Sequence, residues 1–121
     1  MWENIINFKP EEFECQCGCG ENNIDMKLVE IMDSVRELVG FPMRVNSGYR
    51  CEKHNKSIGG ADKSEHLLGR ACDISATDGM KKFKLVDAAI KCGIHRVFIY
   101  NTFIHFDITQ NKTYPYLDKH E

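Results

Sequence analysis

The chain has 121 residues, 42% of them hydrophobic and 28% charged, and 16 Lys and Arg nearly balance 18 Asp and Glu to give a net charge of −2. These values are typical of one globular domain with its own core. Because the basic residues form no stripe and no apolar run approaches the ~20 residues that span a bilayer, we expect neither a nucleic-acid nor a membrane partner.

The N-terminal residues lack the basic and apolar segments of a secretory signal. We therefore expect synthesis in the cytoplasm without a signal peptide. If the protein acts outside the cell, another agent would have to release it. We also expect a monomer.

The first regular element predicted is an amphipathic helix over residues 24–39. Asn22 or Asn23 can cap its start, and Gly40 can end it. A short strand over residues 43–47 follows. The apolar residues that recur at helical spacing in the helix are Ile24, Leu28, Ile31, Val35 and Leu38.

The second half of the chain predicts a brief helix ending at Gly59, a strand over 71–75 and a long helix over 79–92. The face of the long helix expected to be buried carries Phe83, Val86, Ala89 and Ile90. Two strand-like runs, 96–100 and 103–108, flank a two-residue polar turn and predict an antiparallel hairpin. The sum is an α+β domain with helices packed on one small antiparallel sheet.

Six cysteines allow more than one interpretation. Three alternate in one short segment and three are scattered: Cys15, Cys17 and Cys19, then Cys51, Cys72 and Cys92. The alternating trio could bind a soft metal ion, although it lacks the C-x-x-C spacing of a structural zinc site. Ordinary or partly oxidised thiols are the alternative.

Potential metal ligands fall on one face of the predicted sheet. In the last strand the period of two places His105 and Asp107 opposite the core face, which carries Ile104, Phe106 and Ile108. Asp73 lies on the corresponding face of its own strand. His66 precedes it by seven residues, and Gly69 allows the backbone between them to turn tightly.

Two imidazoles and a carboxylate form a three-ligand set that suits a catalytic zinc, with the fourth position open for a water whose pKa falls from 15.7 to about 7. Each residue alone also has an ordinary explanation. His66 could be a loop histidine, His105 a half-buried histidine with its hydrogen bonds satisfied, and Asp73 an acceptor for backbone amides. No ligand role is expected for His54, His95 and His120.

Three segments resemble the zinc D-Ala-D-Ala carboxypeptidase family: Ser47-Gly-Tyr-Arg-Cys-Glu-Lys-His-Asn, Gly59-Gly-Ala and Ser64-x-His-x-x-Gly-x-Ala-x-Asp-Ile. That family includes vancomycin-resistance dipeptidases, phage L-alanyl-D-glutamate endopeptidases and, more distantly, the Hedgehog signalling domain. Phe13-x-Cys-x-Cys-Gly and Phe103-x-His-x-Asp also resemble its short, single-domain phage and bacterial branch. The resemblance covers residues 7–109 of a single domain spanning 1–121 and leaves a C-terminal tail, 110–121.

The resemblance implies the Hedgehog/D,D-peptidase-like fold and one Zn²⁺ held by His66, Asp73 and His105. It also implies that Arg50 binds and polarises the substrate near the scissile amide, which suits a guanidinium. A surface salt bridge is the alternative for Arg50. Ser64 has no paired base and is expected to orient the loop or a ligand at the substrate site, not to act as a nucleophile.

One departure concerns the general base. Better-known members carry a Glu three residues before the last histidine ligand, where this chain has Thr102, and some relatives have a His where this chain has Phe103. Asp107 is the first candidate to replace the missing base, followed by Glu65 and His95. Equally, Asp107 could be a carboxylate that orients a histidine ligand.

The resulting hypothesis is a zinc metallopeptidase that hydrolyses peptide bonds in peptidoglycan stem peptides, as a D,D-carboxypeptidase or an endopeptidase. One alternative is a cell-wall-binding module that keeps the metal but hydrolyses weakly or not at all. Another is a structural domain whose zinc only holds the loop to the sheet.

Overall fold

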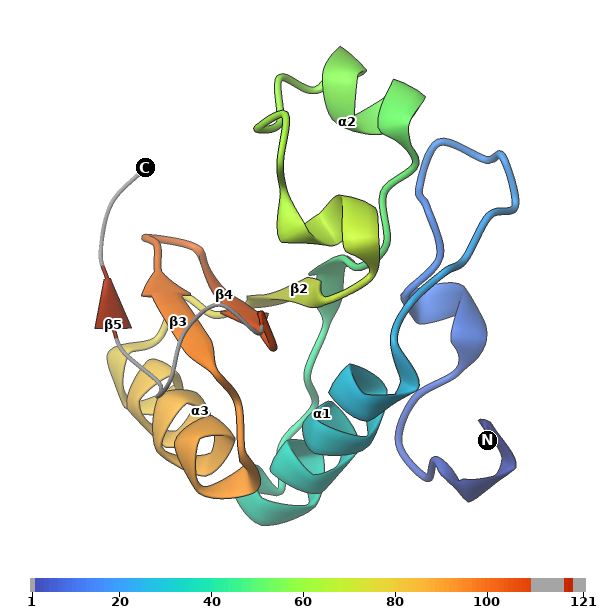
Figure 1. Ribbon diagram of the computed structural model, residues 1–121. Helices are drawn as coiled ribbons and strands as arrows, with labels where there is room; N and C mark the ends of the chain where they lie inside the picture. Colours follow the sequence, from blue (N-terminus) through green and yellow to red (C-terminus); the bar gives the residue numbers. More distant parts are fainter. Residues whose placement is uncertain (1, 110–116, 119–121) are drawn as a thin grey trace.

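The computed structural model describes residues 2–109 and 117–118, and it shows an α+β fold in which helices pack on a sheet (Figure 1). The strands follow the order β1-β2-β4-β3-β5 across the sheet. Their bounds are Val45–Ser47 (β1), Ala71–Ser75 (β2), Arg96–Ile99 (β3), Phe103–Asp107 (β4) and Leu117–Asp118 (β5). Most of the expected C-terminal tail, including His120, lies outside the described residues.

The four strands β1 to β4 are antiparallel, as predicted, and β3 and β4 form the expected hairpin. The N–H of Tyr100 donates to the carbonyl of Phe103 and closes its turn. The two-residue β5 pairs in parallel with β3 at one edge, a pairing that the sequence did not predict. In the centre of the sheet, β2 and β4 pair so that Asp73 lies directly opposite His105.

The helices begin and end close to the predicted bounds: Met26–Val39 (α1), Glu52–Ser57 (α2) and Gly79–Cys92 (α3). The cap of α1 differs from the prediction. Asp25, not Asn22 or Asn23, accepts a hydrogen bond from the N–H of Lys27 at 2.8 Å. The N–H of Asp25 donates to the carbonyl of Gly69, which fixes the extended backbone just before the helix.

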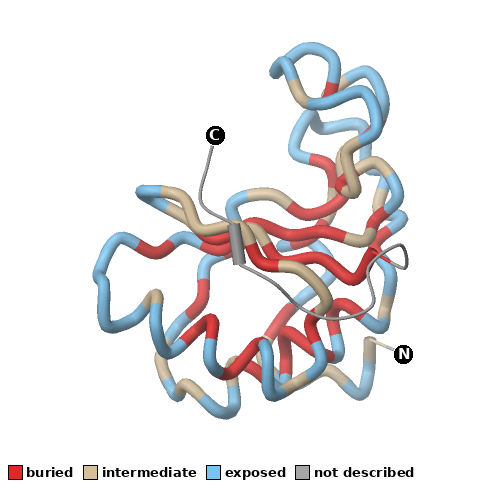
Figure 2. Tube along the Cα trace, turned by 60° about the vertical axis from the view of Figure 1, so that its left-hand side comes forward, coloured by how far each residue is buried: buried red, intermediate tan, exposed pale blue. Residues whose placement is uncertain are grey.

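The main core lies between the sheet and the two long helices, as the buried segments of Figure 2 show. Ile104, Phe106 and Ile108 are all buried on the predicted core face of the hairpin. Three apolar side chains assigned to helix core faces are exposed instead: Leu38 (60%), Phe83 (66%) and Ile90 (43%). The buried stripe of α3 is Leu85, Val86, Ala88 and Ala89, so this helix is rotated relative to the face that its spacing suggested.

The described residues also form three short 3-10 helices: Trp2–Asn4 (η1), Pro10–Glu12 (η2) and Glu65–Leu68 (η3). The N-terminal segment is anchored to α1 by the carboxylate of the buried Asp33, which accepts hydrogen bonds from the backbone N–H groups of Ile6 and Asn7. Phe13, fully buried, joins this segment to the core. Within the described part of the chain, no helix is both long and apolar enough to cross a membrane.

Candidate metal centre

His66 reaches the sheet from η3, through the tight turn expected at Gly69. Ser64 caps η3 by accepting the N–H of His66 at 3.1 Å. Gly69 ends it in the left-handed region at φ +70°, which an L side chain rarely adopts. A Cβ at Gly69 would also lie 2.0 Å from the carbonyl oxygen of Asn23. The turn therefore needs glycine both for its conformation and for its packing.

The structure brings His66, Asp73 and His105 together, and each offers a ligand atom within 4.8 Å of the others. Asp73 Oδ1 lies 3.3 Å from Nε2 of His66 and 3.1 Å from Nδ1 of His105. Asp73 and His105 meet because they are paired on neighbouring strands, while His66 approaches from η3. This is the set of residues that the sequence proposed as metal ligands.

The hydrogen bonds of the two histidines leave one nitrogen of each ring directed at Asp73. His66 Nδ1 lies 2.7 Å from the carbonyl oxygen of Gly48, which can only accept, so Nδ1 carries the proton and Nε2 keeps its lone pair. That Nε2 is buried and has no hydrogen-bond partner among the described residues. An orphaned, unprotonated imidazole nitrogen beside a carboxylate fits a metal ligand.

The charges of the cluster are strongly coupled. Burial alone would raise the pKa of Asp73, but the hydrogen bond with His105 and the close approach of the His66 ring outweigh it and hold the pKa well below its usual range. Burial alone would lower the pKa of His105, whereas its hydrogen bonds to Asp107 and Asp73 raise it to about 8. Asp73 is therefore ionised, and its negative charge favours a cation bound next to it.

Asp107 lies behind His105 and is completely buried. Its Oδ2 is 2.8 Å from Nε2 of His105, the ring nitrogen that faces away from Asp73. Arg96 binds the same carboxylate through Nε at 3.0 and 3.1 Å and through Nη2 at 2.9 Å. The N–H of Thr109 donates to Oδ1 at 3.2 Å. The oxygens of Asp107 are thus engaged by donors that hold it against His105.

Arg50 extends toward the other oxygen of Asp73. Its Nη2 lies 3.6 Å from Asp73 Oδ2, and its side chain is only 14% exposed, so a surface salt bridge does not describe it. Nε donates to Ser47 Oγ at 3.1 Å and Nη1 to Asn55 Oδ1 at 3.0 Å. A Cβ at Gly60 would lie 2.1 Å from that Asn55 oxygen. The guanidinium is therefore held in a fixed orientation at the edge of the cluster.

A cavity of 320 Å³ opens beside His105. The residues that line it include the aromatic Phe98 and Tyr100, the basic Lys63 and the acidic Glu65. Glu65 Oε1 is buried and has no hydrogen-bond partner among the described residues. The cavity is within the size range of ligand sites and mixes apolar walls with a few polar groups.

The remaining histidines that the structure describes lie outside the three-residue cluster. The ring of His95 contacts the carbonyl oxygen of Thr109, and His54 belongs to α2 and lines a different cavity.

Sequence reasoning assigned no role to Arg96, which holds Asp107, or to Asn55, which holds Arg50. Asn55 stands inside the motif that carries the resemblance, but no spacing rule shows that its side chain turns inward to a residue five positions earlier.

Comparisons with known proteins show the family and the fold. Among curated proteins, no sequence matches the chain. A solved structure of the L-Ala D-Glu endopeptidase ChiX from Serratia marcescens is similar in fold, with a TM-score of 0.53 and 21% sequence identity over 82% of this chain and 92% of that one. The model of the family described as peptidase M15 matches residues 6–107, which is most of the chain. The chain therefore belongs to the peptidase M15 family.

Proposed function

We propose that the protein is a zinc-dependent peptidase that cleaves peptide bonds in peptidoglycan stem peptides. The observation that carries the proposal is the cluster of His66, Asp73 and His105, in which two ring nitrogens and a carboxylate oxygen converge beside an open cavity. Family membership and the fold shared with an L-Ala D-Glu endopeptidase support the same chemistry. Zn²⁺ in this site would supply a Lewis acid and lower the pKa of a water molecule.

The protein's own residues would orient and stabilise the reaction. Gly48 holds His66 through Nδ1, and Asp107 holds His105 through Nε2, so each ring presents its other nitrogen. Arg50, fixed by Ser47 and Asn55, directs a guanidinium at the space beside Asp73, where it can stabilise the negative charge that develops on a substrate carbonyl oxygen.

Proton transfer requires a general base, and this chain lacks the glutamate that usually serves as the base in the family. The geometry favours an orienting role for Asp107, because its oxygens already accept from Arg96, His105 and Thr109. Glu65 is the better candidate, since this residue lines the same cavity as His105 and one of its carboxylate oxygens lacks a hydrogen-bond partner among the described residues. A carboxylate there can accept a proton from water and return it to the departing amine.

Digestion of purified peptidoglycan tests the function. Zinc-loaded protein should change the masses of the stem peptides: a D,D-carboxypeptidase removes a terminal D-Ala, whereas an endopeptidase releases larger fragments. A His66→Ala variant and chelated wild-type protein serve as controls and should leave the peptides intact. If zinc-loaded protein bound peptidoglycan but changed no mass at any pH or zinc concentration, the protein would be a cell-wall-binding module instead of a peptidase.

A further inference from the structure

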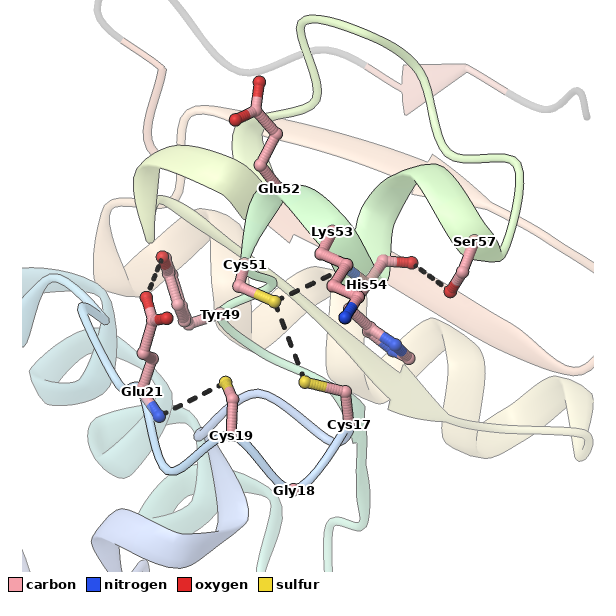
Figure 3. A pocket seen from close by; sticks show the side chains of 10 residues that line it. All are labelled: Cys17, Gly18, Cys19, Glu21, Tyr49, Cys51, Glu52, Lys53, His54 and Ser57. Carbon is pink, nitrogen blue, oxygen red and sulfur yellow. Dashed lines mark hydrogen bonds between the residues drawn. The ribbon is translucent and has the colours of Figure 1, made fainter.

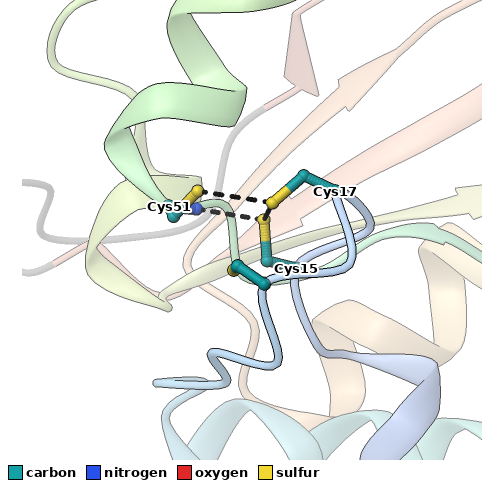
Figure 4. Close-up of side chains that lie close together, drawn as sticks. Cys15, Cys17 and Cys51 are labelled. Atoms are coloured by element: carbon teal, nitrogen blue, oxygen red, sulfur yellow. Dashed lines mark hydrogen bonds between the residues drawn. The ribbon is translucent and has the colours of Figure 1, made fainter.

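Four cysteine thiols gather at one point, away from the three-residue cluster. The alternating Cys15, Cys17 and Cys19 are joined by Cys51, which precedes α2, and their sulfur atoms all lie within 4.8 Å of one another. Cys17 Sγ is 3.5 Å from Cys15 Sγ and 3.7 Å from Cys51 Sγ (Figure 4). The sequence had placed Cys51 among scattered thiols, because 32 residues separate it from Cys19.

These separations match a tetrahedral metal site. A Zn–S bond of about 2.3 Å places the four sulfurs of a regular tetrahedron about 3.8 Å apart. Sulfurs joined in a disulfide lie about 2.05 Å apart. Four cysteines around one ion are also a complete structural zinc set, with no position left for water.

Backbone N–H groups point at three of the sulfurs, as expected around thiolates. The N–H of Cys51 donates to Cys15 Sγ at 3.3 Å, and that of His54 donates to Cys51 Sγ at 3.4 Å. The N–H of Glu21 donates to Cys19 Sγ at 3.4 Å (Figure 3). Hydrogen bonds to sulfur stabilise its negative charge and orient the ligand toward a metal.

The backbone of the N-terminal loop explains how alternating cysteines can share one ion. In an extended strand, side chains two residues apart are separated by about 7 Å. Here Gly18 and Gly20 adopt φ of +88° and +82°, so the chain turns sharply on either side of Cys19. A Cβ at either glycine would meet nothing within 4 Å. Their glycine character is therefore needed for conformation alone.

We propose that Cys15, Cys17, Cys19 and Cys51 bind a second, structural Zn²⁺. This ion joins the N-terminal loop to the segment that carries Arg50, next to Cys51 in the chain. The same junction already contains a backbone hydrogen bond from Tyr49 to Phe13, and the N–H of the neighbouring Arg50 donates to the carbonyl of His66 in η3. Cys15 and Cys51 are buried, while Cys17 and Cys19 are exposed beside a cavity of 740 Å³.

Zinc counting on protein purified anaerobically tests the second site independently of the first. Wild-type protein should hold two equivalents, and a His66→Ala variant should hold one. Adding Cys17→Ser to His66→Ala should remove the remaining equivalent. Cys92→Ser, a change of the same kind at a cysteine outside the cluster, should leave two equivalents in the otherwise wild-type chain.

Cobalt substitution provides a readout that does not depend on whether a cysteine variant folds. Co²⁺ bound to the His66→Ala protein should give the strong near-ultraviolet absorption of thiolate-to-metal charge transfer and the visible bands of tetrahedral cobalt. Absence of these bands, a His66→Ala protein that holds no zinc, or an intact mass showing disulfides among the four cysteines would each overturn the proposal. A protein that holds this second zinc but cleaves no wall peptide would contradict the proposed peptidase function and would support the cysteine site.

Discussion

Replacing Asp107 by asparagine separates the two roles that the sequence left open for this residue. The carboxylate accepts from His105 and Arg96 at Oδ2 and from Arg96 and Thr109 at Oδ1. An amide has only one oxygen, so one of these positions must receive an NH₂ group.

Both orientations of the amide are unfavourable. If its oxygen keeps the Oδ2 position, the NH₂ group faces the donors of Arg96 and Thr109. If it flips, the NH₂ group faces Nε2 of His105, and that ring must carry its proton on Nδ1, the nitrogen directed at Asp73. Zinc affinity should therefore fall by about 10- to 100-fold, the usual effect of losing a carboxylate that orients a histidine ligand. Arg96 also loses its contact with the charged carboxylate of Asp107, which should cost the metal-free protein about 3 kcal/mol.

A chelating dye in competition measures the zinc affinity, and urea unfolding in the presence of chelator measures the stability. Asp87→Asn is the matched control: Asp87 is 48% exposed and pairs only with Lys91 on α3 among the ion pairs described, so both quantities should stay near wild type. Turnover of Asp107→Asn should recover in excess zinc. Unchanged zinc affinity together with lost turnover at saturating zinc would refute this reasoning and make Asp107 the general base.

Three further changes test the surroundings of the cluster. Arg50→Lys keeps the charge but loses the planar fork, so turnover of wall peptides should fall by about 10²–10³-fold with zinc content unchanged; full activity would contradict an oxyanion role. Gly60→Ala places a methyl group against Asn55, so it should lower the free energy of unfolding in urea by about 1–3 kcal/mol and also reduce turnover. Gly79→Ala is the control, because a Cβ there meets nothing within 4 Å, and it should reduce neither stability nor turnover. Glu65→Gln keeps the shape but cannot accept a proton, so turnover at saturating zinc should fall by about 10²–10⁴-fold, and wild-type turnover would exclude Glu65 as the base.

Local pattern in the sequence was sufficient for most elements and for the identity of the clustered residues. The strand over residues 71–75 and the helix over 79–92 have the predicted bounds, because turn residues and apolar period are local properties of the chain. The same period of two placed Asp73 and His105 on the face opposite the core. That His66 would join them from its loop was predicted from the resemblance of its motif to the zinc D-Ala-D-Ala carboxypeptidase family.

Tertiary structure decided every relation that depends on register or rotation between distant elements. The pairing of β2 with β4 sets Asp73 against His105, and the packing of α3 turns Phe83 outward despite its helical spacing. Only the fold carries Cys51 to the alternating cysteines of the N-terminal loop. Periodicity fixes where a side chain points within its own element, but the distance between elements comes from how the whole core packs. For that reason the sequence suggested His66, Asp73 and His105 as metal ligands, while the contacts of Asp107 and the position of Cys51 became visible only in three dimensions.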